Sequence, residues 1–208
     1  MTRTGRPPLT QERRAEIRLE IARAAVDLFV RQGVTGTTGD QIGQAVGMSA
    51  RTLWRYFPSK ESCVRPLLTA GIDVIAVCLR DWLPGQPLEE AFARVLHTEG
   101  RVVAGPEPAA VGALVRLTRT EPGLRAVWLQ AHDEAEPVFA HALAARSGLP
   151  ADDLRPALRA AMLNAALRVA VEHYAWHTPG PGQDPATAEA ELTASIRSAL
   201  AVAAEGLR

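Results

Sequence analysis

The residues best suited to chemistry lie between positions 38 and 61, in the stretch TGDQIGQAVGMSARTLWRYFPSKE. An arginine can bond guanine O6 and N7 together, a threonine can contact a base edge or a thymine methyl, and tyrosine and lysine reach phosphates. Arg51 and Thr52 share the outward side of an expected helix, opposite Leu53 and Phe57, which face inward. This pattern predicts a surface that binds double-stranded DNA.

Two short helices must position these side chains, and the sequence indicates where each begins. Thr38 and Gln41 form a capping box, in which the hydroxyl accepts from a backbone N–H and the glutamine reaches back. Gly47 ends the first helix, and Ser49 can cap the second. A lone amphipathic helix that binds nothing is the alternative. The combination of caps, turn and outward donors favours a helix-turn-helix whose second helix enters the major groove.

Nine residues form the predicted DNA-binding set. Those expected on phosphates are Thr38, Trp54, Tyr56 and Lys60, and those expected close to bases are Ala50, Arg51, Thr52 and Arg55, with Ser49 at the start of the same helix. An indole N–H can donate to a phosphate as a phenol does, so Trp54 is kept in the set.

The N-terminal segment, over about residues 10 to 65, resembles the tetracycline-repressor (TetR) family, in which a long first helix precedes the pattern TT...IA..AGVS..TLY.YF.SKE. The matching positions are Thr37, Thr38, Ile42, Ala45, Gly47, Ser49, Thr52, Leu53, Tyr56, Phe57, Ser59, Lys60 and Glu61. The chain departs from this pattern at Gly39, Gly43, Met48 and Trp54, where apolar residues, valine and tyrosine are usual. The resemblance implies a dimer whose helical body binds a small effector.

Composition is ordinary for a soluble globular protein, with 47% hydrophobic and 22% charged residues among 208. The net charge of zero hides an asymmetry: residues 1–62 hold ten basic and six acidic residues, a net +4, and the remainder carries −4. DNA binding by one end requires such a distribution. With no signal-peptide core and no apolar run of roughly twenty residues, we expect a cytoplasmic protein without a membrane partner. Cys63 and Cys78 are expected to be free thiols.

Helical periodicity continues along the whole chain, and no strand-like alternation interrupts it. We therefore predict an all-α fold, with a three-helix helix-turn-helix domain followed by a larger helical domain for ligand binding and dimerisation. The predicted parts are a flexible basic arm (1–9), the DNA-binding domain (10–57), a connecting helix (58–83) and the body (84–208). Helices are expected at about 11–32, 88–103, 108–120, 122–147, 153–177 and 186–205, with breaks at prolines and glycines.

The body contains aromatic and polar side chains that would be costly to bury without a partner, and such groups typically line ligand pockets. The candidate pocket residues are Phe92, His97, Trp128, His132, Asn164 and Arg168. They suit a largely hydrophobic molecule with one polar or anionic group, although each residue alone is more often core or surface. No metal or cofactor is predicted, since the pairs His132/Glu136 and His173/His177 lack further ligands. No catalytic motif occurs, so an enzyme is not expected.

The last two predicted helices are rich in alanine, which allows helices to approach closely. The candidate dimer residues are Leu158, Ala161, Ala165, Leu192, Ile196, Ala199 and Ala203. An intramolecular core is the alternative. The full hypothesis is a homodimeric repressor that binds a pseudo-palindromic operator and is released by a small molecule. The alternatives are an effector-independent activator or architectural protein, and a ligand-binding or interaction module whose head has lost DNA affinity.

Overall fold

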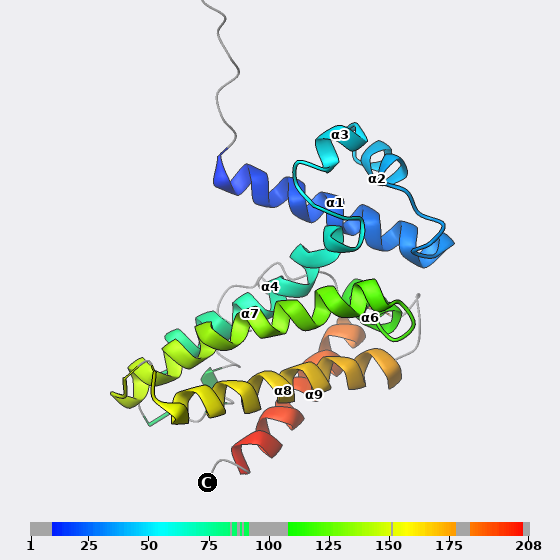
Figure 1. Cartoon of the computed structure of the whole chain (residues 1–208). Coiled ribbons are helices and arrows are strands. Elements are labelled where there is room, and N and C mark those ends of the chain that lie inside the picture. The colour runs from blue at the N-terminus through cyan, green and yellow to red at the C-terminus, as the bar shows by residue number, and fades with distance from the viewer. Residues whose placement is uncertain are drawn as a thin grey trace, which may run out of the picture. The chain divides into compact units, whose positions relative to one another are not determined.

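The computed structural model describes residues 10–83, 85, 86, 88, 90, 91, 108–150, 152–177 and 184–205, and the regular elements named within them are helices (Figure 1). They are α1 (Gln11–Gln32), α2 (Gly39–Ala45), α3 (Ala50–Leu53), the 3-10 helix η1 (Glu61–Val64), α4 (Arg65–Arg80), α6 (Pro108–Leu117), α7 (Pro122–Ser147), α8 (Leu154–His177) and α9 (Pro185–Glu205). The predicted all-α fold class is confirmed. The arm at 1–9 and most of the helix predicted at 88–103 lie outside the described residues.

The chain divides into two units, one that ends at Pro66 and one that begins at Leu67, which we call the head and the body. The head contains α1, α2, α3 and η1, and η1 packs against α1. The span 58–83, predicted as one connecting helix, contains η1 and then α4, which ends at Arg80. The bounds of α7, α8 and α9 agree with the predicted ranges to within one residue.

The head is organised around the apolar side of α1, on which Ile21, Ala25 and Phe29 are fully or almost fully buried. The hydroxyl of Thr10 caps the start of α1 by accepting from the Arg13 N–H, and Gly33 ends the helix with φ 77°. The other helices of the head contribute further buried side chains, namely Ile42, Leu53, Phe57, Cys63 and Val64. Removal of these apolar groups from water is the main free energy that holds the short helices in place.

The turn between α2 and α3 follows the local signals of the sequence. Gly47 has φ 70°, a left-handed conformation that glycine adopts at little cost, and α3 begins directly after the cap residue Ser49. The helix α3 is shorter than expected, because the inward-facing pair Leu53 and Phe57 suggested that the helix would reach Phe57. Regular α-helix ends at Leu53, and the chain continues through hydrogen-bonded turns, in which the Phe57 N–H donates to the Leu53 carbonyl over 3.1 Å.

In the described part of the body, a hydrophobic core forms where α4, α7, α8 and α9 pack together. Its buried residues are Val74, Ile75, Cys78 and Leu79 of α4, Ala135, Phe139 and Leu143 of α7, Ala160, Leu163 and Leu167 of α8, and Leu200 of α9. Figure 1 shows α7 and α8 side by side, and they pack closely along their lengths. The segment Glu61–Arg80 is long and apolar enough by composition to cross a membrane. Within the described residues, 44% of its most apolar window is buried, including the α4 residues that join the body core.

Two glycines provide a test of this packing. A Cβ on Gly43 in α2 would lie 2.7 Å from the Met48 carbonyl oxygen, whereas a Cβ on Gly71 in α4 would meet no atom within 4 Å. We expect Gly43→Ala to lower the free energy of unfolding by about 1–3 kcal/mol, because backbone must move. Gly71→Ala should raise it by about 1 kcal/mol, through helix propensity. Urea unfolding followed by circular dichroism measures both, and a stable Gly43→Ala variant would contradict the tight packing of the turn.

Candidate DNA-binding surface and a buried polar cluster in the body

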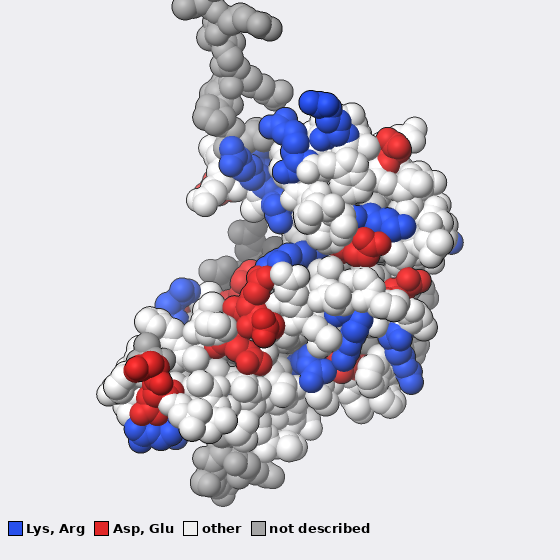
Figure 2. All heavy atoms as spheres, in the orientation of Figure 1, with Lys and Arg blue, Asp and Glu red and all other residues white. Residues whose placement is uncertain are grey.

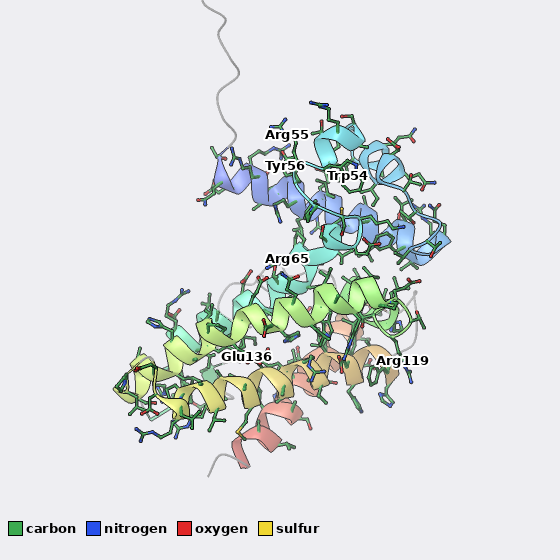
Figure 3. The ribbon with its side chains drawn as sticks, viewed as in Figure 1. Trp54, Arg55, Tyr56, Arg65, Arg119 and Glu136 are labelled. Atoms are coloured by element: carbon green, nitrogen blue, oxygen red, sulfur yellow. The ribbon has the colours of Figure 1, made fainter. Side chains whose placement is uncertain are left out.

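The predicted DNA-binding residues lie around α2, α3 and the turn that follows. Thr38, Ser49, Arg51, Trp54 and Arg55 are exposed, while the remaining members of the set, Ala50, Thr52, Tyr56 and Lys60, are half-buried. Figure 3 shows Trp54, Arg55 and Tyr56 beside α3, and Figure 2 shows basic side chains gathered on this unit. Cationic groups and hydrogen-bond donors are therefore presented from one short helix and its continuation, an arrangement suited to a nucleic-acid backbone and base edges.

Two of these residues also build the helices that carry the others. The Gln41 N–H donates to the Thr38 hydroxyl over 3.3 Å, and the Thr38 N–H donates to the Gln41 Oε1 over 2.8 Å, which completes the predicted capping box. The Ser49 hydroxyl accepts from the Thr52 N–H over 3.2 Å. Loss of such a cap typically costs about 1 kcal/mol. Thr38 and Ser49 therefore fix the starts of α2 and α3 in the absence of DNA.

Lys60 is placed differently from the expectation of a side chain extended toward phosphate. Its ammonium donates to the Val34 carbonyl over 2.6 Å and to the Thr37 carbonyl over 3.0 Å. Two of its three protons are thus used within the head, where they tie the loop after α1 to the start of η1. This contact spans more than twenty residues, and no local pattern in the sequence indicates it.

Arg18 of α1 is a further residue that the sequence analysis did not select. Its guanidinium donates to the Tyr56 carbonyl over 3.1 Å and lies 4.5 Å from the centre of the Phe57 ring. A cation above an aromatic ring is attracted by the ring quadrupole. Arg18 therefore holds the chain after α3 against α1, and so fixes the position of the residues that follow the short helix.

Gly39 and Trp54, two of the departures from the family pattern, form one packing arrangement. A Cβ on Gly39 would lie 2.0 Å from Trp54 Cζ2 and 2.6 Å from Cη2, distances that no real side chain could keep. The indole therefore occupies the volume that a side chain at position 39 would fill. The ring remains 44% exposed, so it packs on the start of α2 and also reaches the surface.

A second group of functional candidates lies between α7 and α8 of the body, centred on the carboxylate of Glu172. This carboxylate is buried and accepts hydrogen bonds from Arg125, from Trp128 Nε1 at 3.1 Å and from Arg168 at 3.3 Å. The sequence analysis selected Trp128 and Arg168 but missed Arg125 and Glu172. The i, i+4 spacing of Arg168 and Glu172 was the available local signal.

One helical turn further along α7, a second hydrogen-bonded network joins His132 to Asn164 of α8. His132 Nδ1 lies 2.6 Å from Asn164 Oδ1, and Asn164 Nδ2 donates to the His132 carbonyl at 3.0 Å and to Glu136 Oε1 at 2.9 Å. The rings of Trp128 and His132 meet edge to face, with centres 4.2 Å apart. Four of the predicted pocket residues are thus brought together, and Phe92 and His97 lie outside the described residues.

The two histidine pairs considered for metal binding have other contacts. His132 and Glu136 both bond Asn164, while the exposed rings of His173 and His177 stack with centres 4.1 Å apart. Within the described ranges, no group of three histidine, cysteine, aspartate or glutamate side chains is arranged to hold a metal ion.

The buried charge of Glu172 leads to a prediction about pH. Burial raises the pKa of Glu172, but hydrogen bonds from Arg125 and Trp128 and the nearby arginine charges outweigh it, so the pKa is lowered from 4.5. The stability that this carboxylate contributes is therefore present above about pH 4.5 and is lost as the pH falls through the lower folded pKa. We expect Glu172→Gln to cost about 2–3 kcal/mol at neutral pH and to weaken the acid dependence of unfolding.

Urea unfolding at a series of pH values measures both effects. Asp133→Asn, which changes an exposed carboxylate on α7, is the matched control and should alter stability by less than about 0.5 kcal/mol. Equal effects of the two substitutions would show that Glu172 does not join α7 to α8.

Comparisons with known proteins agree with both units. The model of the family described as bacterial regulatory proteins, tetR family, matches residues 21–67, and the model of the MftR C-terminal domain matches residues 86–208. The HTH-type transcriptional regulator TcmR of Streptomyces glaucescens is 35% identical over 172 residues, which are 78% of this chain and 75% of that protein.

Solved structures show the same fold. GusR of Salmonella enterica aligns with a TM-score of 0.52 at 20% identity, over 92% of this chain and 96% of that one. The fatty acid degradation regulator FadR of Bacillus halodurans aligns with a TM-score of 0.50 at 15% identity, over 96% and 99%. With the capped helix-turn-helix of the head and the matching family models, these findings show that the chain belongs to the TetR family of DNA-binding transcriptional regulators, which are not enzymes.

Proposed function

We propose that this regulator is a cytoplasmic homodimeric repressor that binds a pseudo-palindromic operator and leaves it when a small molecule occupies the body. The observation that carries the proposal is the exposure of Arg51 and Arg55 on and directly after a helix whose start and end are fixed within the head. Preformed donors of this kind suit direct reading of base edges in the major groove.

The proposed division of labour follows the surroundings of each side chain. Arg51 and Arg55 read bases together with the neighbouring Ala50 and Thr52, while Thr38, Ser49, Trp54 and Tyr56 contact the phosphate backbone. Lys60 is assigned a positioning role, because its ammonium already serves two carbonyls of the head. The net +4 charge of residues 1–62 adds attraction that does not depend on sequence.

Substitution of Arg51 tests the base contact. Arg51→Ala should weaken operator binding by about 1–3 kcal/mol and relax the sequence preference, because one bidentate base contact is lost. Arg31→Ala, which removes an exposed arginine of α1, is the control for charge alone and should leave the preference unchanged. Binding-site selection from random DNA followed by mobility shifts measures both. If the two variants lost affinity equally on every sequence, Arg51 would not read a base.

The proposed dimer uses the exposed apolar side of α8. Leu154, Leu158, Met162, Ala165 and Val169 follow one another at spacings of three or four residues and are all exposed, with Leu158 at 53% and Val169 at 54%. Such a stripe on a helix typically packs against another helix. Ala161 is half-buried beside it. On α9, Leu192, Ile196, Ala199 and Ala203 are half-buried, and Ile196 packs on the body core, so α8 is the main contributor in this proposal.

The oligomeric state can be tested with matched alanine substitutions. Light scattering should give twice the chain mass of 22.3 kDa for the unmodified protein and for Ala145→Glu, an exposed site on α7. Ala165→Glu should yield monomer, because an unpaired carboxylate is costly to bury in an apolar interface. A monomeric unmodified protein at micromolar concentration would contradict the two-half-site mechanism.

Release requires a ligand that binds the DNA-incompetent conformation more tightly than the DNA-bound one. Recognition helices of a dimer must lie about 34 Å apart to enter successive major grooves, so a modest change in the body is sufficient to break the match. The polar cluster between α7 and α8 supports a ligand site there, since it places hydrogen-bonding groups and an aromatic ring among apolar side chains.

A further inference from the structure

One nitrogen of the His132 imidazole has no partner among the residues that the structure describes. Its side chain is buried, and Nε2 makes no hydrogen bond to any group among the described residues. An unpaired polar atom in an interior is costly, and native structures rarely keep one without a reason. A hydrogen-bond donor that reached this nitrogen would therefore supply a bond that the described residues do not.

The contacts of Asn164 determine what kind of group Nε2 can receive. The side-chain amide of Asn164 faces two acceptors, the His132 carbonyl and Glu136 Oε1, so the atom on that side must be its NH₂ group. The amide oxygen therefore faces His132 Nδ1 at 2.6 Å, and Nδ1 must carry the proton. In a neutral ring the other nitrogen, Nε2, is then a bare acceptor.

The surroundings keep the ring neutral. Burial lowers the pKa of His132, and the charge of Arg168 lowers it further, although Asn164, Glu172 and Glu136 act in the opposite direction. The charges of the cluster also balance: Arg125 and Arg168 both bond Glu172, and the second carboxylate, Glu136, accepts from Asn164. No excess positive charge within this cluster is available to attract an anionic ligand.

We propose that the effector of this regulator donates a hydroxyl or N–H group to His132 Nε2 and places its apolar part near Trp128. The ligand class is thus a neutral apolar or aromatic molecule with a hydrogen-bond donor, such as a phenol, and a carboxylate is disfavoured by the lone pair of Nε2. This inference rests on the proposed function, in which the body binds an effector. The sequence allowed a ligand with either a polar or an anionic group, and the contacts of His132 favour a neutral hydrogen-bond donor.

The first measurement is the tautomer of His132 in the full-length protein. Nitrogen-15 NMR of protein labelled only at its five histidines should show one ring protonated at Nδ1 with a bare Nε2. That signal should disappear in His132→Phe and persist in His141→Phe, which makes the same change at an exposed position of α7. Asn164→Leu removes the acceptor of Nδ1–H and should abolish the preference for this tautomer. A ring protonated at Nε2 in the unmodified protein would overturn the proposal.

The second measurement is a titration of the same signal with phenol, anisole and benzoate, which share a ring and differ in their polar group. Phenol should shift the Nε2 resonance and bind roughly tenfold or more tightly than anisole or benzoate, since only phenol donates to the bare nitrogen. The preference should vanish in His132→Phe and remain in His141→Phe. Equal binding of the three probes, or no shift with phenol at its solubility limit, would overturn the proposed ligand class.

Operator mobility shifts of the same proteins separate this inference from the proposed function. His141→Phe touches neither the head nor the polar cluster, so this variant should bind operator like the unmodified protein. A failed phenol titration with intact DNA binding would overturn the ligand class alone. If the unmodified protein did not bind operator DNA, the proposed function would be overturned, whichever tautomer His132 adopts.

Discussion

The base-reading part of the head depends on hydrogen bonds that close the ends of helices too short to be stable alone. Isolated helices of fewer than about twelve residues are marginal in water, and α2 has seven residues and α3 four. Thr38, Ser49, Lys60 and Arg18 satisfy the backbone at the starts of these helices, in the preceding loop and after α3. The arginines presented to DNA are therefore held by contacts that themselves read no base, and this preorganisation reduces the entropy lost on binding.

In the body, buried polar groups fix the relative position of two helices, α7 and α8. A carboxylate such as Glu172 can be buried only if donors compensate its charge, and its donors come from two helices. With the His132–Asn164 bond one turn away on α7, this arrangement fixes how α7 and α8 align along their axes. Apolar packing alone tolerates small slips between alanine-rich helices, whereas two separate polar links do not. The same links place the unpaired nitrogen of His132 at a defined position.

Much of this architecture could be predicted from the sequence, because its signals are local. The capping box at Thr38, the turn at Gly47 and the ends of α7 and α8 each depend on residues within a few positions of one another. The contacts of Lys60 and Arg18, and those that join Glu172 to Arg125 and Trp128, could not, since they link residues between 23 and 47 positions apart. Only the Arg168–Glu172 pair has a local spacing. The early end of α3 at Leu53 also escaped prediction, because the apolar pattern continues to Phe57 while the regular helix does not.

The fit of Trp54 against Gly39 couples the two positions. A chain with glycine at 39 and a smaller ring at 54 has only a gap, which neighbouring side chains or water can fill. With the tryptophan ring placed as it is here, any side chain at 39 would overlap it at the start of α2. A side chain at position 39 is therefore compatible only with a different placement of the Trp54 indole, so a substitution at one position changes what the other can accept.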